Sequence, residues 1–279
     1  MEKKYEIILF GATGFTGQLC AKYFKQNYPD LTWAIAGRDK NKLDDINNKF
    51  NLNVDSLVAD GDNLEALRVM AGQAKVILST AGPFARYSDL LVQACVEQGT
   101  HYTDITGENH WVRTLIDKHH ENASLKGVRI VPSCGYDSIP SDIGTFFAVS
   151  QFNKPVKRVE LFQEMQGGAS GGTIETAFSM GKLSKEMRDP FLLNPENSST
   201  EEQRKYSKDM MRIEKIEELD GWSGMFVMAA GNTRVVRRTA ALMEQNQNSY
   251  GANFTFGEYG LHKTKKLARR ASYGLILGF

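Results

Sequence analysis

Short apolar runs alternate with amphipathic stretches along the first half of the chain. The runs are rich in β-branched and aromatic residues, which is typical of strands buried on both faces of a parallel sheet. The stretches between them carry apolar residues at helical spacing. The predicted strands cover residues 5–10, 31–36, 54–60, 76–79, 101–104 and 128–132. This alternation predicts an α/β fold with a doubly wound parallel sheet of the Rossmann type.

The second half of the chain carries a different pattern. Residues 156–165 are strand-like, and the glycine-rich segment 167–173 precedes apolar residues at helical spacing from Ile174 onwards. Such a loop at a helix N-terminus can hold a substrate carboxylate or phosphate, and the alternative is a flexible turn before an ordinary helix. We expect a dinucleotide-binding domain over residues 1–133 and a substrate or dimerisation domain over residues 134–279.

The sequence ILFGATGFTG links the first predicted strand to the first helix and contains three glycines. Gly11 allows a sharp turn, Gly14 lets a pyrophosphate approach the backbone, and Gly17 permits close packing of the helix on the sheet. The N–H groups at the helix N-terminus then favour the phosphate. The alternative is an ordinary corner between strand and helix, because the spacing is GxxGxxG and not the commoner GxGxxG.

The end of the second predicted strand indicates which dinucleotide is bound. NAD-binding sites usually carry an acidic residue there, which accepts a hydrogen bond from the ribose 2′-hydroxyl. Here Gly37 and Arg38 take this place, with Lys42 one helical turn further on. A guanidinium suits a 2′-phosphate and favours NADP. Two alternatives remain, namely that Asp39 reaches the ribose or that Arg38 is merely solvated.

Composition narrows the class of protein. The 279 residues carry a net charge of +1, which gives no electrostatic signature for nucleic acid. The three cysteines have no metal or redox spacing, and their scatter favours a reduced, cytoplasmic protein. The five histidines indicate no metal site. We expect no signal peptide and no segment long enough to span a bilayer.

Ligands of such sheets bind beyond the carboxyl ends of the strands, so the residues at those ends are candidates for cofactor contacts. Ala81, Gly82 and Pro83 follow the fourth strand and suit a backbone that lies against the ribose and nicotinamide. Asp60 follows the third strand and can meet the adenine edge. Plain turns are the alternative at both places.

Several motifs together resemble the saccharopine dehydrogenase-like oxidoreductases, and most closely the branch with the trans-acting enoyl reductases and the animal saccharopine dehydrogenase-like oxidoreductase. The resemblance covers nearly the whole chain. It rests on GATGFTG, AGRDKNKL, STAGPFARYSDLLVQAC, HYTDITGE, SCGYDSIPSDIG, SGGT, PFLLNP and NTRVVRRTAAL. It implies an NADP-binding Rossmann domain, a second α+β domain built on a mixed sheet, and hydride transfer. Family members run longer, so we expect either a truncated or a naturally short form.

The resemblance also assigns cofactor contacts by motif. Arg38 would meet the 2′-phosphate. The nicotinamide side would be lined by Ala81, Gly82, Pro83 and Phe84. The pyrophosphate would be held by Gly11, Ala12, Thr13, Gly14, Phe15, Thr16 and Gly17.

The candidate catalytic residues follow the last strand of the first domain. Tyr136 can donate a hydrogen bond to a substrate oxygen, and Asp137 can orient it or relay a proton. The alternative is that Asp137 or Ser141 caps the following helix. Cys134 is more simply a small buried residue than a nucleophile.

Basic residues mark two further segments. Arg234, Arg237 and Arg238 lie one turn apart on a predicted helix, where they can bind an acidic substrate group or sit in solvent. The end of the chain places basic residues before the apolar run 271–279. We expect this tail to pack within the protein or a homodimer rather than on a membrane surface.

We therefore expect an NADP(H)-dependent enzyme that reduces a C=C, C=O or C=N bond of a small molecule, lipid-like or carboxylate-bearing. The rival hypothesis is a non-catalytic NADP(H)-binding protein that acts through protein partners or a membrane surface.

Overall fold

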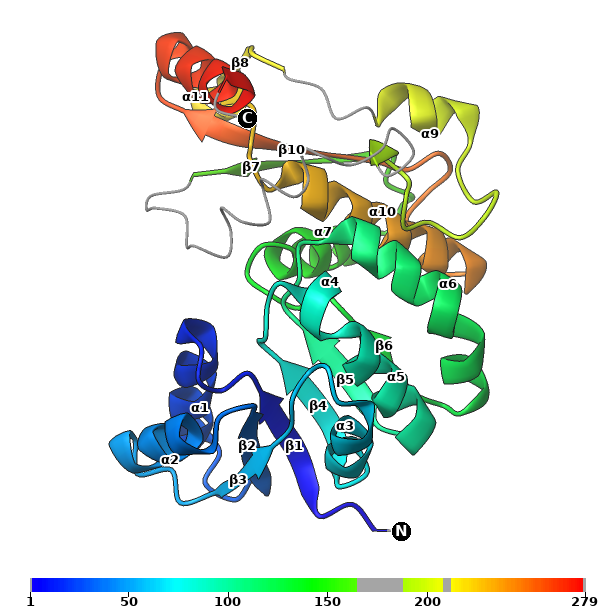
Figure 1. The fold of residues 1–279 in the computed structure, drawn as a ribbon. Helices are drawn as coiled ribbons and strands as arrows, with labels where there is room; N and C mark the ends of the chain where they lie inside the picture. The colour runs from blue at the N-terminus through cyan, green and yellow to red at the C-terminus, as the bar shows by residue number, and fades with distance from the viewer. Residues whose placement is uncertain (1, 165–187, 208–211, 278–279) are drawn as a thin grey trace. The chain divides into compact units, whose positions relative to one another are not determined.

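The computed structural model describes residues 2–164, 188–207 and 212–277, with side chains up to residue 273 in the last range. The chain divides into two compact units, Met1–Gly135 and Tyr136–Phe279 (Figure 1). The glycine-rich segment 167–173 and the helix expected from Ile174 lie outside the described residues.

A six-stranded parallel sheet forms the centre of the first unit. The strand order is β3-β2-β1-β4-β5-β6, and each pair of neighbours is parallel. This order confirms the doubly wound sheet predicted from the sequence. The strands are β1 (Tyr5–Phe10), β2 (Trp33–Gly37), β3 (Asp55–Val58), β4 (Ala74–Ser79), β5 (His101–Asp104) and β6 (Ile130–Val131).

Helices cover both faces of this sheet. One face packs on α1 and α2, where Leu9 and Ile35 of the sheet form a buried cluster with Leu43 of α2. Figure 1 shows α3 and α5 on the opposite side. The helices are α1 (Phe15–Asn27), α2 (Lys40–Lys49), α3 (Leu64–Ala71), α4 (Phe84–Tyr87), α5 (Asp89–Gln98) and α6 (Asn109–Leu125).

A four-stranded mixed sheet forms the centre of the second unit and confirms the expected α+β character. The order is β7-β10-β9-β8, with β10 parallel to β7 and antiparallel to β9. The strands are β7 (Arg158–Gln163), β8 (Lys215–Ile216), β9 (Gly221–Gly224) and β10 (Thr255–His262), and the 3-10 helix η2 (Glu217–Leu219) links β8 to β9.

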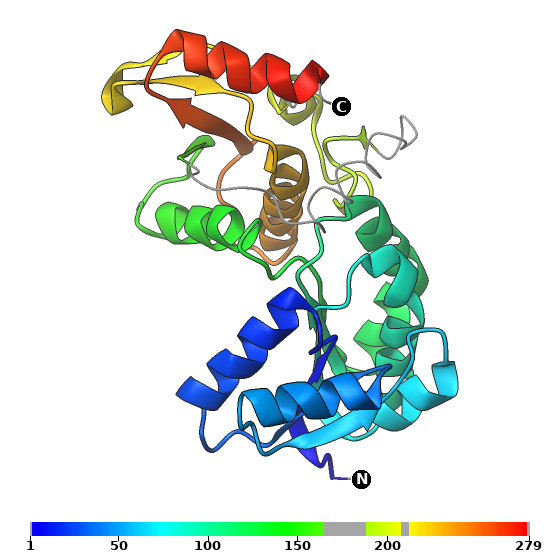
Figure 2. The ribbon, with the colours of Figure 1, turned by 60° about the vertical axis from the view of Figure 1, so that its left-hand side comes forward.

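The helices that the structure describes in this unit are α7 (Ile139–Ser150), α9 (Glu201–Tyr206), α10 (Ala229–Gln245) and α11 (Lys265–Leu277). Val236 of α10 and Phe256 of β10 form a buried cluster that Val149 of α7 also contacts. Figures 1 and 2 show α10 and α11 on opposite sides of β10.

Part of the basic and apolar tail packs inside the second unit. Ala268 and Ser272 of α11 are fully buried, and the hydroxyl of Ser272 accepts a hydrogen bond from the N–H of Met225 at 2.8 Å. Side chains beyond Tyr273 lie outside the description. Among the described helices, none combines the length and apolar character needed to cross a membrane.

Candidate cofactor site

The three glycines of the first turn have different surroundings. Gly11 has a φ of +83°, and a Cβ added there would lie 2.8 Å from the backbone nitrogen of Ala81. A Cβ on Gly17 would lie 2.3 Å from the carbonyl oxygen of Gly11. Gly14 is exposed, and the nearest described atom to an added Cβ, apart from the neighbouring residues of the chain, is that same carbonyl oxygen, at 3.4 Å. Gly11 and Gly17 are therefore required by the turn itself, whereas Gly14 borders open space.

The N-terminus of α1 carries no negative charge of its own. Gly14 is the N-cap residue, no side chain accepts a hydrogen bond from the first turn, and no acidic residue lies in that turn. The N–H groups of the first turn of a helix have no intrahelical acceptor, and they carry partial positive charge. An open glycine beside this helix end fits the pyrophosphate of a dinucleotide.

The end of β2 presents a cation. Arg38 is exposed and forms no ion pair within the part of the chain that the structure describes. The neighbouring Asp39 is the N-cap of α2, and its carboxylate accepts a hydrogen bond from the N–H of Lys42 at 3.2 Å. The fold thus employs Asp39 at the helix end and leaves the guanidinium free to meet a 2′-phosphate.

The loop that follows β4 lies directly against the glycine turn. The hydroxyl of Thr80 donates to the carbonyl oxygens of Phe10 and Gly11, both at 3.2 Å. The fold therefore brings together two predicted segments that are far apart in sequence. Asp60, after β3, is exposed, and one of its carboxylate oxygens accepts a hydrogen bond from the N–H of Asp62 at 3.1 Å, as in an ordinary turn.

Asp104, at the end of β5, is a fully buried carboxyl group that the sequence analysis did not single out. It accepts hydrogen bonds from the N–H groups of Thr106 (3.0 Å) and Ser133 (2.9 Å) and from the hydroxyl of Tyr102 (2.8 Å). Burial raises the pKa of Asp104 to about 6. Ser133 itself has a φ of +63°, a left-handed conformation that a non-glycine residue rarely adopts. The hydrogen bond from Ser133 to Asp104 thus holds the backbone of Ser133 in this strained conformation.

The two candidate catalytic residues belong to the second unit. Tyr136 is 79% exposed, and Asp137 is half-buried, which raises the pKa of its carboxyl group. Helix α7 begins at Ile139 with no side-chain cap. The alternative that Asp137 or Ser141 caps this helix is therefore wrong.

A buried carboxyl group anchors the beginning of α7. Glu258 of β10 is 5% exposed, and one of its oxygens accepts hydrogen bonds from Ser141 (2.7 Å), Gln163 (3.0 Å) and Asn232 (3.2 Å). Burial raises the pKa of Glu258, and the nearby carboxylate of Asp137 raises it further. The hydroxyl of Ser138 donates to Asn232 at 3.1 Å, so the residue after Asp137 is tied to α10.

The solvent-exposed alternative is wrong for Arg234 and Arg237 of α10. These two are 6% and 4% exposed. Arg234 donates to the carbonyl oxygen of Arg188 at 2.8 Å, and Arg237 donates to that of Pro190 at 3.0 Å. Arg238 likewise donates to Leu193 at 2.5 Å. The bonds of Arg237 and Arg238 hold the PFLLNP segment against the helix.

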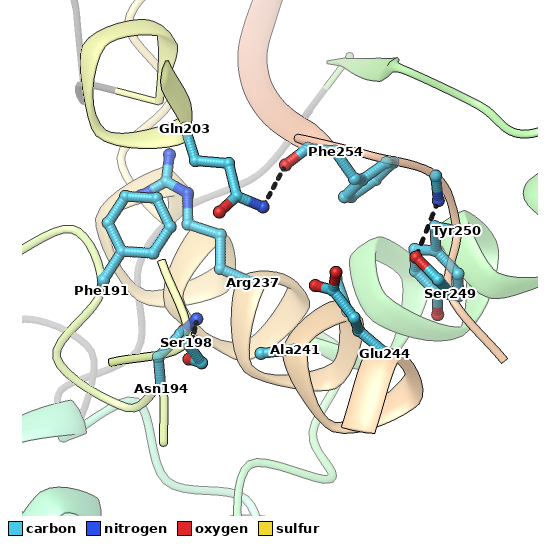
Figure 3. Close-up of a pocket in the computed structure, with 12 residues that line it drawn as sticks. Phe191, Asn194, Ser198, Gln203, Arg237, Ala241, Glu244, Ser249, Tyr250 and Phe254 are labelled. Atoms are coloured by element: carbon cyan, nitrogen blue, oxygen red, sulfur yellow. Dashed lines mark hydrogen bonds between the residues drawn. The ribbon is translucent and has the colours of Figure 1, made fainter. Parts of the chain in front are cut away.

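A small cavity of about 10 Å³ lies beside Arg237 in the second unit (Figure 3). Gln203 and Phe254, which are joined by a hydrogen bond of 3.2 Å, contribute to its wall, as does the ring of Phe191. A volume of this size holds about one water molecule and excludes any organic substrate. Within the described ranges, no group of three or more His, Cys, Asp or Glu side chains could hold a metal ion.

Comparison with known proteins agrees with the geometry of the first unit. Residues 7–131 match the family model of the saccharopine dehydrogenase NADP-binding domain. NADP is therefore the cofactor of this unit, and the open turn at Gly14 and the exposed Arg38 fit it.

Curated relatives extend the match over the whole chain. A trans-acting enoyl reductase of Mycobacterium ulcerans is 34% identical in an alignment that is 299 residues long and covers 99% of this chain and 71% of the relative. One from Mycobacterium leprae is 34% identical in an alignment that is 281 residues long and covers 92% of this chain and 65% of the relative. The chain thus spans about two thirds of the length of these relatives.

Among solved structures, apo saccharopine dehydrogenase from Saccharomyces cerevisiae aligns with a TM-score of 0.48 and 14% identity, over 57% of this chain and 34% of that protein. A TM-score below 0.5 adds no argument about the fold. The sequence match to the mycobacterial proteins is decisive, and this chain belongs to the saccharopine dehydrogenase-like family, on the branch of the trans-acting enoyl reductases.

Proposed function

We propose that this protein is an NADP(H)-dependent oxidoreductase that transfers a hydride between the cofactor and a C=C, C=O or C=N bond of a small-molecule substrate. The observation that supports it best is the combination of an uncapped helix N-terminus at Gly14 with the exposed guanidinium of Arg38. The names of the relatives favour a C=C bond conjugated to a carbonyl group as the bond that is reduced.

NADPH supplies the hydride, and the protein binds and orients the reactants. The backbone around Gly14 holds the pyrophosphate, and Arg38 binds the 2′-phosphate. The loop of residues 81–84 lines the nicotinamide side, and Asp60 approaches the adenine.

The second unit provides the substrate site in this proposal. The hydroxyl of Tyr136 donates a hydrogen bond to the substrate oxygen, and Asp137 supplies or relays the proton. The raised pKa of Asp137 supports this role, because burial favours the protonated form of the carboxyl group. The substrate is lipid-like or carries a carboxylate.

Replacing Arg38 with alanine should weaken NADPH binding about 10- to 100-fold and leave NADH binding unchanged. Losing a charge-assisted contact to phosphate costs roughly 1.5–3 kcal/mol, which corresponds to this range of affinity. Fluorescence titration with both cofactors measures the effect. Arg129→Ala is a matched control, because Arg129 is exposed and precedes β6 at the opposite edge of the sheet.

Equal affinity of the wild-type protein for NADPH and NADH would contradict the assignment of Arg38. Catalysis is tested separately, by following the oxidation of NADPH with enoyl thioesters, ketones and imines, and with lipid extracts. Substrate-dependent oxidation is the expected result. Tight NADPH binding without oxidation by any of these compounds would favour the non-catalytic rival.

A further inference from the structure

Glu108, directly before α6, is a second buried carboxylate that the proposed function does not use. It is 4% exposed. One of its oxygens accepts a hydrogen bond from the N–H of Phe84 at 2.8 Å, and the other accepts one from the N–H of Ala85 at 3.0 Å. Its own N–H donates to the hydroxyl of Thr106 at 3.0 Å, which fixes the backbone at this point.

These two N–H groups open the four-residue helix α4, which cannot cap itself. The N-cap residue is Pro83, and it makes no side-chain hydrogen bond. Buried N–H groups without an acceptor are costly, and a carboxylate at a helix N-terminus forms stronger, charge-assisted bonds. Glu108 therefore supplies the cap from 24 residues further along the chain.

The loop of residues 81–84 is consequently fixed at both ends. Its beginning lies on the glycine turn, where Ala81 leaves no space for a side chain on Gly11. Its end is held by two contacts. The N–H of Phe84 donates to Glu108, and the ring of Phe84 stacks on that of Trp111 in α6, with centroids 6.1 Å apart. Between these anchors Gly82 is exposed and presents its backbone.

We propose that Glu108 is a positioning residue for the nicotinamide half of the cofactor, because it fixes the backbone of the 81–84 loop. The inference rests on the proposed function, in which this loop lines the nicotinamide side. Glu108 itself touches neither the cofactor nor the substrate.

Two ligands separate the two halves of the dinucleotide. NADPH contacts the whole site, whereas adenosine 2′,5′-bisphosphate has the adenine, the ribose and the 2′-phosphate but lacks the nicotinamide. Glu108→Gln keeps the size of the side chain but turns an amide N–H₂ toward a backbone N–H, so one of the two hydrogen bonds is lost. We expect the affinity for NADPH to fall about tenfold and that for adenosine 2′,5′-bisphosphate to stay the same.

Glu97→Gln is the matched control. Glu97 lies on α5 in the same unit, where its carboxylate pairs with Arg68 at 2.6 Å and accepts a hydrogen bond from Gln93 at 2.9 Å. Both affinities should be unchanged in this variant. If Glu108→Gln does not fold, Glu108→Asp keeps the charge but is too short to reach both N–H groups, and it should show the same selective loss.

An equal loss of affinity for both ligands would overturn the inference, because Glu108 would then support the unit as a whole. Unchanged affinity for NADPH would also overturn it, as would a wild-type protein that binds both ligands equally. A wild-type protein that binds neither ligand would contradict the proposed function, and the inference with it. The fluorescence emission of bound NADPH is an independent readout. The shift of this emission on binding should decrease in Glu108→Gln and stay unchanged in Glu97→Gln.

Discussion

Valine in place of Gly14 should abolish NADPH binding and leave the stability of the protein unchanged. The backbone of Gly14 is extended, with φ −73° and ψ 167°, which any residue can adopt. An added Cβ meets no atom closer than 3.4 Å, so the fold has room for the side chain. The branched side chain would occupy the space that the pyrophosphate needs, and we expect a loss of at least about 100-fold in affinity, or roughly 3 kcal/mol. Fluorescence titration measures binding, and thermal unfolding followed by circular dichroism measures stability.

Gly17→Ala provides the opposite result from the same turn. Its Cβ would lie 2.3 Å from the carbonyl oxygen of Gly11 and 2.7 Å from the Cα of Ala12, and backbone atoms cannot yield as a flexible side chain can. We expect this smaller substitution to cost about 3 kcal/mol or more in the free energy of unfolding. Tight NADPH binding by Gly14→Val would show that the glycines serve the turn alone.

The stability of the first unit should decrease by about 3 kcal/mol between pH 3 and pH 8 because of Asp104 alone. The pKa of this carboxyl group is 3.8 as its ordinary value and about 6 in the fold, where burial disfavours the charged form. The folded state therefore binds more protons than the unfolded state in this window, and stability falls as the pH rises through it. A shift of about two pKa units corresponds to about 3 kcal/mol.

Asp104→Asn should remove this dependence. The amide oxygen can still accept from the N–H groups of Thr106 and Ser133, and the amide nitrogen can donate to Tyr102. Asp142 of the second unit also has a pKa raised to about 6 by burial, so the comparison requires a signal from the first unit. Urea unfolding of a Trp222→Phe background, followed by tryptophan fluorescence, provides that signal. Identical pH profiles with and without Asp104 would contradict the prediction.

Local signals in the sequence predict much of the first unit. The strands over residues 5–10 and 101–104 have the predicted bounds. A glycine also marks the end of α5, where Gly99 adopts a φ of +64°. The spacing of the glycines likewise predicts the turn, because only glycine satisfies the contacts at Gly11 and Gly17.

Local sequence signals do not predict which charged side chains are buried, because the partners of these side chains are distant in sequence. In HYTDITGE, Asp104 and Glu108 resemble the residues of an exposed loop, yet both are buried against backbone N–H groups of other segments. The same holds for Arg234 and Arg237, since the carbonyl oxygens to which they donate lie 46 and 47 residues earlier in the chain. Sequence periodicity reports which face of a helix is apolar, and it cannot report where an unpaired carbonyl group will be.

The pairing of β7 with β10 has a consequence for the order in which the protein assembles during synthesis. These parallel strands come from opposite ends of the second unit's sequence, whereas every strand of the first unit precedes Gly135. On the ribosome, the first unit can therefore complete its sheet while β10 has yet to be made. Until then β7 lacks the strand with which it pairs in the sheet, and unpaired strands of this kind are bound by chaperones and promote aggregation. Expression at lower temperature or with added chaperones should thus benefit the second unit more than the first.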